Sequence, residues 1–236
     1  MQRGKAPMKT TFCSTLVLAA ATVQVLAATV YPDATGDFTP EGFGYLDITS
    51  VEVDNDGTTL SFRINLADNP LAVDWAKYLI GLDTAAGGNT TGPDAWGKPI
   101  SMSVGGMDYF IGSWMNFGTG AEVRVWDGSA WNAVSDSGIT VTTDASSVTL
   151  ALPFSVLNLN LGDTFRFDVY TTSDGNSVLD AAGSTVPLTW NNNPYDSGEN
   201  VLSYTLVPEP ALPALLLVGG ALWCGWRGRR ARGCAA

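Results

Sequence analysis

Closely spaced aspartates near residue 35 are the first residues with potential for chemistry. Asp33-Ala-Thr-Gly-Asp37 places two carboxylates around a glycine turn, and Asp47 follows at the start of an expected strand. Carboxylate oxygens in such a turn are hard ligands of the kind that calcium prefers. We therefore treat Asp33, Asp37 and Asp47 as a candidate calcium site, with a solvated acidic loop as the alternative. Asp54-Asn-Asp-Gly57 is better explained as a hairpin turn, because it lacks the later ligands of an EF-hand loop.

Tryptophans form a second group of residues with potential for binding. Six lie between residues 29 and 206, several beside glycine, asparagine or aspartate. An exposed indole presents an apolar face to the C–H surface of a sugar ring, while neighbouring polar groups bind its hydroxyls. Trp126 and Trp131 flank a glycine turn that contains Asp127, so a tight hairpin would make them cross-strand neighbours. We predict a carbohydrate platform of Trp126, Asp127, Trp131 and Trp96, with Trp114 in the core. The alternative is that these rings all pack in the core.

Catalytic chemistry is strongly limited because the sequence contains no histidine. A Ser-His-Asp triad, a histidine general base and histidine-ligated zinc, copper or haem are therefore excluded. A glycoside hydrolase would need a pair of positioned carboxylates. The aspartates instead fall in turns or on polar strand faces, where solvation explains them. We expect a protein that is not an enzyme, and a carboxylate-based glycoside hydrolase is the alternative that the sequence favours least.

Charge is distributed unevenly along the chain. The 236 residues carry a formal charge of −11, but residues 29–206 contain 22 acidic residues against 5 basic ones, a balance of −17. Such a surface repels nucleic acid and anionic lipid, and it attracts cations. We therefore expect no nucleic-acid partner and no nucleotide cofactor.

Residues 1–28 have the three parts of a secretory signal peptide. A basic start precedes the apolar stretch Phe12 to Ala21, and small residues up to Ala27 provide a cleavage site. This pattern predicts export through the Sec pathway. Because Met8 is itself followed by a normal signal start, the sequence leaves open whether translation begins at Met1 or at Met8.

A second targeting element is expected in residues 207–236. It begins with Val207, Pro208, Glu209 and Pro210. The apolar segment 211–226 follows, and sixteen residues span roughly 24 Å as a helix. After it comes the positive cluster of Arg227, Arg229, Arg230 and Arg232. Since the positive-inside rule keeps such a cluster in the cytoplasm, the pattern alone predicts a C-terminal membrane anchor with the preceding residues on the outer side.

The Val-Pro-Glu-Pro motif, apolar span and arginine cluster, in that order at the extreme terminus, resemble the PEP-CTERM sorting signal of Gram-negative bacteria. The resemblance implies that the chain is a substrate of exosortase, a membrane enzyme that cuts near the Pro-Glu-Pro element. The protein would then occupy the inner membrane transiently and finish at the cell surface or in the extracellular matrix.

Residues 29–206 are expected to form one domain of short strands separated by glycine, asparagine and aspartate turns. Apolar residues occupy every second position in Leu60 to Leu66 and in Phe165 to Tyr170, as in half-buried antiparallel strands. Ten such runs predict an all-β fold, an antiparallel β-sandwich of jelly-roll or immunoglobulin-like type. A change of apolar parity between Ile48 and Val51 predicts a β-bulge, and Pro153 is expected to begin one short helical turn.

The first half of this domain resembles a DOMON-like or family 9 carbohydrate-binding-like β-sandwich. The resemblance is carried by the acidic opening Asp33 to Asp37 and by the strands Leu46 to Val53, Thr59 to Leu66 and Lys77 to Asp83. It covers about residues 32–131 and implies a fold that binds sugars or, in other branches, haem. The absence of histidine disfavours the haem branch.

Together these features predict an exported, non-enzymatic protein of the cell surface or of a biofilm matrix that binds polysaccharide. The alternative is a structural matrix or adhesion protein without a small ligand. Neither the sugar nor the oligomeric state follows from the sequence.

Overall fold

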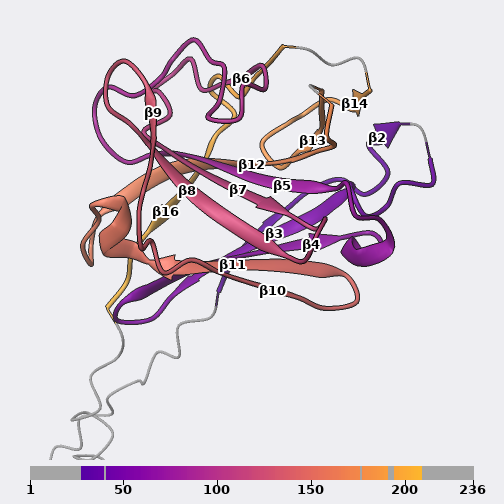
Figure 1. Ribbon diagram of the computed structural model, residues 1–236, viewed down its shortest axis with the longest axis horizontal. Coiled ribbons are helices and arrows are strands. Elements are labelled where there is room, and N and C mark those ends of the chain that lie inside the picture. The colour runs from indigo at the N-terminus through magenta and orange to yellow at the C-terminus, as the bar shows by residue number, and fades with distance from the viewer. Residues whose placement is uncertain (1–27, 40, 176, 191–193, 209–236) are drawn as a thin grey trace, which may run out of the picture. The chain divides into compact units, whose positions relative to one another are not determined.

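The computed structural model describes residues 28–39, 41–175, 177–190 and 194–208 (Figure 1). These residues fold into β-strands and two short 3-10 helical turns. No helix in this part of the chain combines the length and the apolar character needed to cross a membrane. Residues 1–27 of the expected signal peptide (1–28) and residues 209–236 of the expected sorting signal (207–236) lie outside the described residues. The prediction of an all-β fold with antiparallel sheets is confirmed.

The smaller sheet has five antiparallel strands in the order β1-β3-β4-β11-β10. Their bounds are Thr29–Pro32 (β1), Ile48–Asn55 (β3), Thr59–Leu66 (β4), Ser147–Pro153 (β11) and Thr140–Thr143 (β10). The register of β3 against β4 shifts between Ile48 and Ser50, which confirms the predicted bulge. The two strands are joined by the predicted turn, in which the Asp56 carboxylate accepts the backbone N–H groups of Thr58 and Thr59.

The larger sheet has seven strands. Six follow the order β13-β12-β5-β7-β8-β9, and β16 pairs with the first half of β12 while β13 pairs with its second half. The bounds are Val178–Ala181 (β13), Thr164–Thr172 (β12), Lys77–Asp83 (β5), Tyr109–Trp114 (β7), Gly120–Trp126 (β8), Trp131–Ala133 (β9) and Leu202–Thr205 (β16).

Four short strands and two helical turns complete the described elements. Two parallel pairs join distant segments: β2 (Phe38–Thr39) with β14 (Leu188–Thr189), and β6 (Ile100–Ser101) with β15 (Tyr195–Asp196). The 3-10 turns are η1 (Pro70–Ala72) and η2 (Phe154–Leu157). The second of these confirms the helical turn expected after Pro153.

Side chains from both sheets share one buried cluster, so the two sheets face each other. The Phe62 ring of β4 contacts the rings of Phe165 and Phe167 of β12, with centroid distances of 6.2 and 5.4 Å. All three side chains are buried. Each fully buried side chain of this kind stabilises the fold by about 1.5 to 3 kcal/mol, so this facing contact holds the sheets together.

The outer face of the larger sheet is also covered. A second buried cluster joins Leu79, Phe110 and Tyr170 of the sheet to Ile100, Met102 and Met107 in residues 84–108 and to Leu188 in residues 182–201. Figure 1 shows β6 and β14 on one side of β12, β5, β7 and β8, with β3, β4, β11 and β10 on the other. Burial on both sides explains why β5 is buried along almost its whole length.

This covering layer corrects the expectation that β12 is only half-buried. Asp168 and Tyr170, which alternate with the phenylalanines of β12, are both fully buried on its outer face. Asp168 accepts hydrogen bonds from the Gly183 backbone and from the Ser197 hydroxyl, which also bonds the Tyr170 hydroxyl. Asp168 and Tyr170 are therefore paired with the covering layer and not with water.

The end of the domain is held by one asparagine. Asn55, at the end of β3, accepts hydrogen bonds from the Tyr204 hydroxyl and the Val207 backbone through Oδ1, both at 2.9 Å. Its Nδ2 donates to the Val207 carbonyl at 2.9 Å. These hydrogen bonds hold Val207, which lies two residues after the end of β16 and is the first residue of the expected sorting motif.

We predict that Asn55→Ala lowers the free energy of unfolding by about 1 to 3 kcal/mol, because it leaves the Tyr204 hydroxyl and Val207 N–H without their acceptor. Asn160→Ala is the control, since that exposed side chain makes one surface hydrogen bond to Asp163. Urea unfolding measures both variants. Equal stability of Asn55→Ala and the wild type would contradict the role of Asn55.

Candidate functional site

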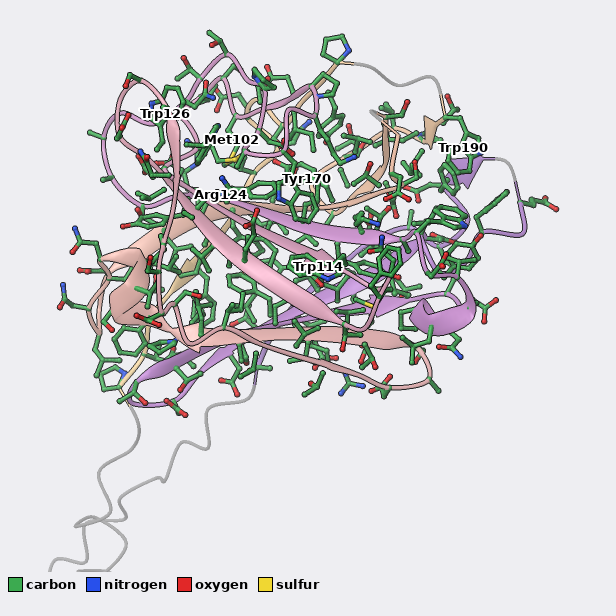
Figure 2. The ribbon with its side chains drawn as sticks, in the orientation of Figure 1. Met102, Trp114, Arg124, Trp126, Tyr170 and Trp190 are labelled. Carbon is green, nitrogen blue, oxygen red and sulfur yellow. The ribbon has the colours of Figure 1, made fainter. Side chains whose placement is uncertain are left out.

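Five aromatic rings form a continuous row on the outer face of β7, β8 and β9. In order they are Trp114, Trp96, Phe110, Trp131 and Trp126, with successive centroid distances of 6.2, 5.3, 6.4 and 5.4 Å. Phe110 is buried and the four tryptophans are half-buried. We call these five residues the aromatic row. Figure 2 shows Trp126 and Trp114 near opposite ends of β8.

The alternation of the strands produces this row. Val123 of β8 points into the core between the sheets, so its neighbours Glu122, Arg124 and Trp126 lie on the outer face. Trp126 pairs directly with Trp131 across the β8–β9 hairpin, which confirms that the two are cross-strand neighbours. The expected division into a core Trp114 and three surface indoles does not appear, because all four have similar intermediate burial.

Two glycines provide space for the indoles. A Cβ atom at Gly112 of β7 would lie 2.3 Å from Cζ2 of Trp96, and one at Gly120 of β8 would lie 2.5 Å from Cζ2 of Trp114. Both approaches are far closer than van der Waals contact. The rings therefore lie directly against backbone, and any other residue at either position would displace them.

The segment around residue 95 positions Trp96 over the sheet. Asp94 Oδ1 accepts the backbone N–H groups of Trp96 and Lys98, each at 2.9 Å. Trp96 Nε1 donates to Glu122 Oε1 at 2.5 Å, and Glu122 also pairs with Arg124 at 2.9 Å. Trp96 is thus fixed at both its backbone and its ring nitrogen.

A cavity borders each end of the aromatic row. One, of about 350 Å³, is lined by Lys77, Trp96, Trp114, Asn116 and Phe117. The other, of about 180 Å³, includes Trp126 and Tyr109 in its lining.

Phe117 lies at the tip of the β7–β8 turn. Its side chain is fully exposed, the most exposed large apolar side chain among the described residues. Its φ of 55° is in the left-handed region, which is uncommon for residues other than glycine. An aromatic ring in this position contributes no buried surface to the fold.

Asp127, the acidic member of the expected platform, shapes its own turn. Its Oδ1 accepts the backbone N–H groups of Ser129 and Ala130, and Oδ2 accepts Asn132 Nδ2, each at 2.8 Å. These hydrogen bonds lower the pKa of Asp127 to about 2. The carboxylate therefore stabilises the hairpin that presents Trp126 and Trp131.

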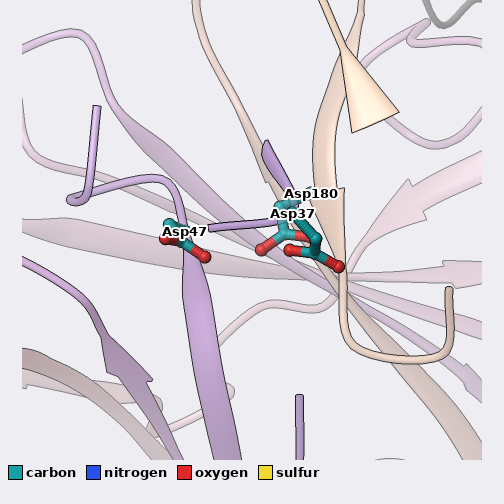
Figure 3. Close-up of side chains that lie close together, drawn as sticks. All are labelled: Asp37, Asp47 and Asp180. Carbon is teal, nitrogen blue, oxygen red and sulfur yellow. The ribbon is translucent and has the colours of Figure 1, made fainter. Parts of the chain in front are cut away.

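Three aspartates meet at a second place in the fold. One carboxylate oxygen from each of Asp37, Asp47 and Asp180 lies within 4.8 Å of the others (Figure 3). Of the expected ligands, Asp37 and Asp47 are brought together. Asp33 is outside this trio, but its charge raises the pKa of Asp180. Asp180 was not predicted as a ligand from the sequence. The signal that indicates it is its position as a single acidic residue within the apolar run of β13.

The surroundings of the three aspartates combine backbone donors with buried charge. Asp180 Oδ2 accepts the Ile48 N–H at 2.6 Å, and Asp47 Oδ2 accepts the Gly36 N–H at 2.8 Å. Burial raises the pKa of Asp180 to about 9, against the opposing effect of the Ile48 hydrogen bond. Burial also raises the pKa of Asp33 to about 7, and the charges of Asp37 and Asp47 contribute in the same direction.

The sorting residues are described only in part. Val207 is half-buried and Pro208 is exposed, whereas Glu209, Pro210 and the arginine cluster lie outside the described residues.

No protein-family model matches this chain, and no curated protein matches it. The likenesses to PEP-CTERM signals and to DOMON-like domains therefore stay predictions drawn from the residues themselves.

We predict that Asp94→Asn makes the protein less sensitive to pH. Burial raises the pKa of Asp94 from 3.8 to about 6. The folded state thus holds the proton more tightly, and stability falls as the pH rises from about 4 to 6. A shift of this size corresponds to about 3 kcal/mol. Asparagine keeps the Oδ1 acceptor but cannot ionise.

Urea unfolding at pH 4 and pH 7 provides the test. The free energy of unfolding of Asp94→Asn minus that of the wild type should rise by up to about 3 kcal/mol from pH 4 to pH 7. A difference between variant and wild type that is the same at both pH values would show that Asp94 does not titrate in this range.

Proposed function

We propose that this protein is an exported, non-enzymatic polysaccharide-binding protein of the cell surface or extracellular matrix. The observation that carries the proposal is the aromatic row, which extends across an outer sheet face between two cavities and has the fully exposed Phe117 beside one end.

The chemistry of the row suits a sugar chain. Half-exposed indoles offer flat apolar surfaces for the C–H faces of successive sugar rings. Asn116 in the larger cavity and the Glu122–Arg124 pair beside the row supply groups that can hydrogen-bond hydroxyls. An extended surface with a hollow at each end fits a polymer better than a single compact ligand.

Phe117 gives independent support. A solvated phenylalanine in a left-handed backbone conformation does not stabilise the domain, and exposed apolar side chains beside a cavity are typical of interaction sites. The negative balance of residues 29–206 disfavours acidic polymers as well as nucleic acid. We therefore propose a neutral polysaccharide as the ligand.

Fold and targeting are part of the same proposal. Two antiparallel sheets that face each other across one core support a DOMON-like β-sandwich. The N-terminal and C-terminal signals support export followed by exosortase processing. The last hydrogen bonds of the domain, at Val207, leave the sorting motif adjacent to the folded part.

We predict that Phe117→Ala and Trp126→Ala each weaken retention on the bound polysaccharide about five- to tenfold, since a stacked ring contributes about 1 to 1.5 kcal/mol. Glycan arrays identify the polymer, and affinity electrophoresis in gels that contain it measures retention. Leu71→Ala, another exposed apolar side chain remote in sequence from the row, is the matched control and should bind as wild type.

Thermal melting separates binding from folding. Phe117→Ala should leave the melting temperature unchanged, because the ring is fully exposed. Full retention by a Phe117→Ala, Trp126→Ala double variant would refute the site. If the wild type binds no polymer at all, the structural adhesion protein becomes the better proposal.

We also predict that the mature protein lacks the residues beyond about Pro210. Mass spectrometry of the protein recovered from the cell surface should find a C-terminus near the Pro-Glu-Pro element. Replacing Arg229 and Arg230 with glutamate should reduce membrane retention before processing, because the positive-inside rule requires those charges. Recovery of a mature chain that still ends at Ala236 would contradict exosortase processing.

A further inference from the structure

The aspartates near β3 and β13 form a concentration of negative charge without a basic partner among the described residues. The four ion pairs of this part of the chain involve other acids: Asp144, Asp174, Glu122 and Asp83. Lys98, the remaining base, donates to the carbonyls of Ser173 and Gly175. No basic side chain of the described residues therefore pairs with Asp37, Asp47 or Asp180.

Unpartnered oxygens are the second, independent observation. Asp37 Oδ1, Asp47 Oδ1 and Asp33 Oδ2 are buried and have no hydrogen-bond partner among the described residues. Asp47 is only 7% exposed, and its carboxylate lies toward Asp37 and Asp180 (Figure 3). A buried carboxylate oxygen without a partner is strongly unfavourable, so a missing ligand is the simplest account of the unpartnered oxygens of the neighbouring Asp37 and Asp47.

We infer that Asp37, Asp47 and Asp180 bind one calcium ion. All the donors are carboxylate oxygens, which favour hard cations over zinc or copper. Calcium accepts six to eight oxygen ligands in flexible geometry, whereas magnesium prefers one or two carboxylates and retains several waters. Three carboxylates from separate segments therefore fit calcium better.

The ligands come from segments that the ion would join. Asp37 precedes β2, whose neighbour β14 donates the Leu188 N–H to the Asp37 carbonyl at 3.1 Å. Asp47 precedes β3 of the smaller sheet, and Asp180 belongs to β13 of the larger sheet. The Ile48 N–H already bonds Asp180 across this boundary. Calcium would thus fasten the two sheets and the covering layer at one edge.

Calcium titration of the full-length protein after chelator treatment tests this inference. Isothermal calorimetry should find one calcium per chain, with weaker binding of magnesium. Because the ion binds only the folded state, the folding equilibrium constant should rise about a hundredfold at a calcium concentration one hundred times the Kd. No heat and no change in melting temperature with calcium would overturn the inference.

Asp180→Asn and Asp37→Asn should abolish the calcium-induced rise in melting temperature. Both substitutions preserve side-chain size. Asp37→Asn also removes like-charge repulsion without calcium, so this variant should melt no lower than the chelated wild type. Asp180→Asn loses one carboxylate oxygen that accepts the backbone N–H of Ile48 or Ala181, so the readout for that variant is its calcium response and not its absolute melting temperature. Asp136→Asn is the matched control, because this exposed residue has a φ of 52° that asparagine also adopts.

The outcomes also separate this inference from the polysaccharide proposal. Phe117→Ala and Trp126→Ala should retain the full calcium response, since neither residue belongs to the aspartate group. A calcium response that survives in both Asp180→Asn and Asp37→Asn would remove these aspartates from the site and leave the aromatic row unaffected.

Discussion

Burial of the larger sheet on both faces is the constraint on which the rest of this structure depends. Its inner face packs against the smaller sheet through rings such as Phe62 and Phe167, and its outer face packs under residues 84–108 and 182–201. A strand that is buried on both faces of its sheet needs apolar residues at consecutive positions. In β5 these include Tyr78, Leu79 and Ile80. The covering segments contain little regular structure. Side-chain contacts and the two short pairs of parallel strands therefore hold them against the sheet.

Both candidate sites lie where the covering layer meets this sheet. On the side toward the β9 edge, Asp94 folds the backbone around Trp96 so that its ring lies on Gly112 of β7 and continues the aromatic row. At the other edge, Asp180 of β13 bonds the backbone of Ile48, and Thr171 of β12 bonds the carbonyl of Leu46 at 2.6 Å. Edges leave rings half-exposed and carboxylates incompletely paired, and these are the conditions under which side chains can bind ligands.

Local patterns in the sequence predicted the features that depend on neighbouring residues. Alternation located the main strands, parity located the bulge after Ile48, and turn chemistry made Trp126 and Trp131 neighbours. The second covered face could not be predicted, because a strand such as β12 alternates in the same way whether its polar residues meet water or a buried network. Asp180 was missed for a related reason: its partners Asp37 and Asp47 are more than 130 residues away, and only the pairing of distant segments brings them together.

The way in which the domain ends bears on the proposed sorting. Tyr204 of β16 and Leu206 just after the strand belong to the core, so the last strand is part of the folded unit and is not a linker. Asn55 then bonds both backbone groups of Val207, after which Pro208 is exposed. Under the proposed sorting, a cut near Pro210 would fall beyond these hydrogen bonds, so the contacts between Asn55 and Val207 would stay with the domain.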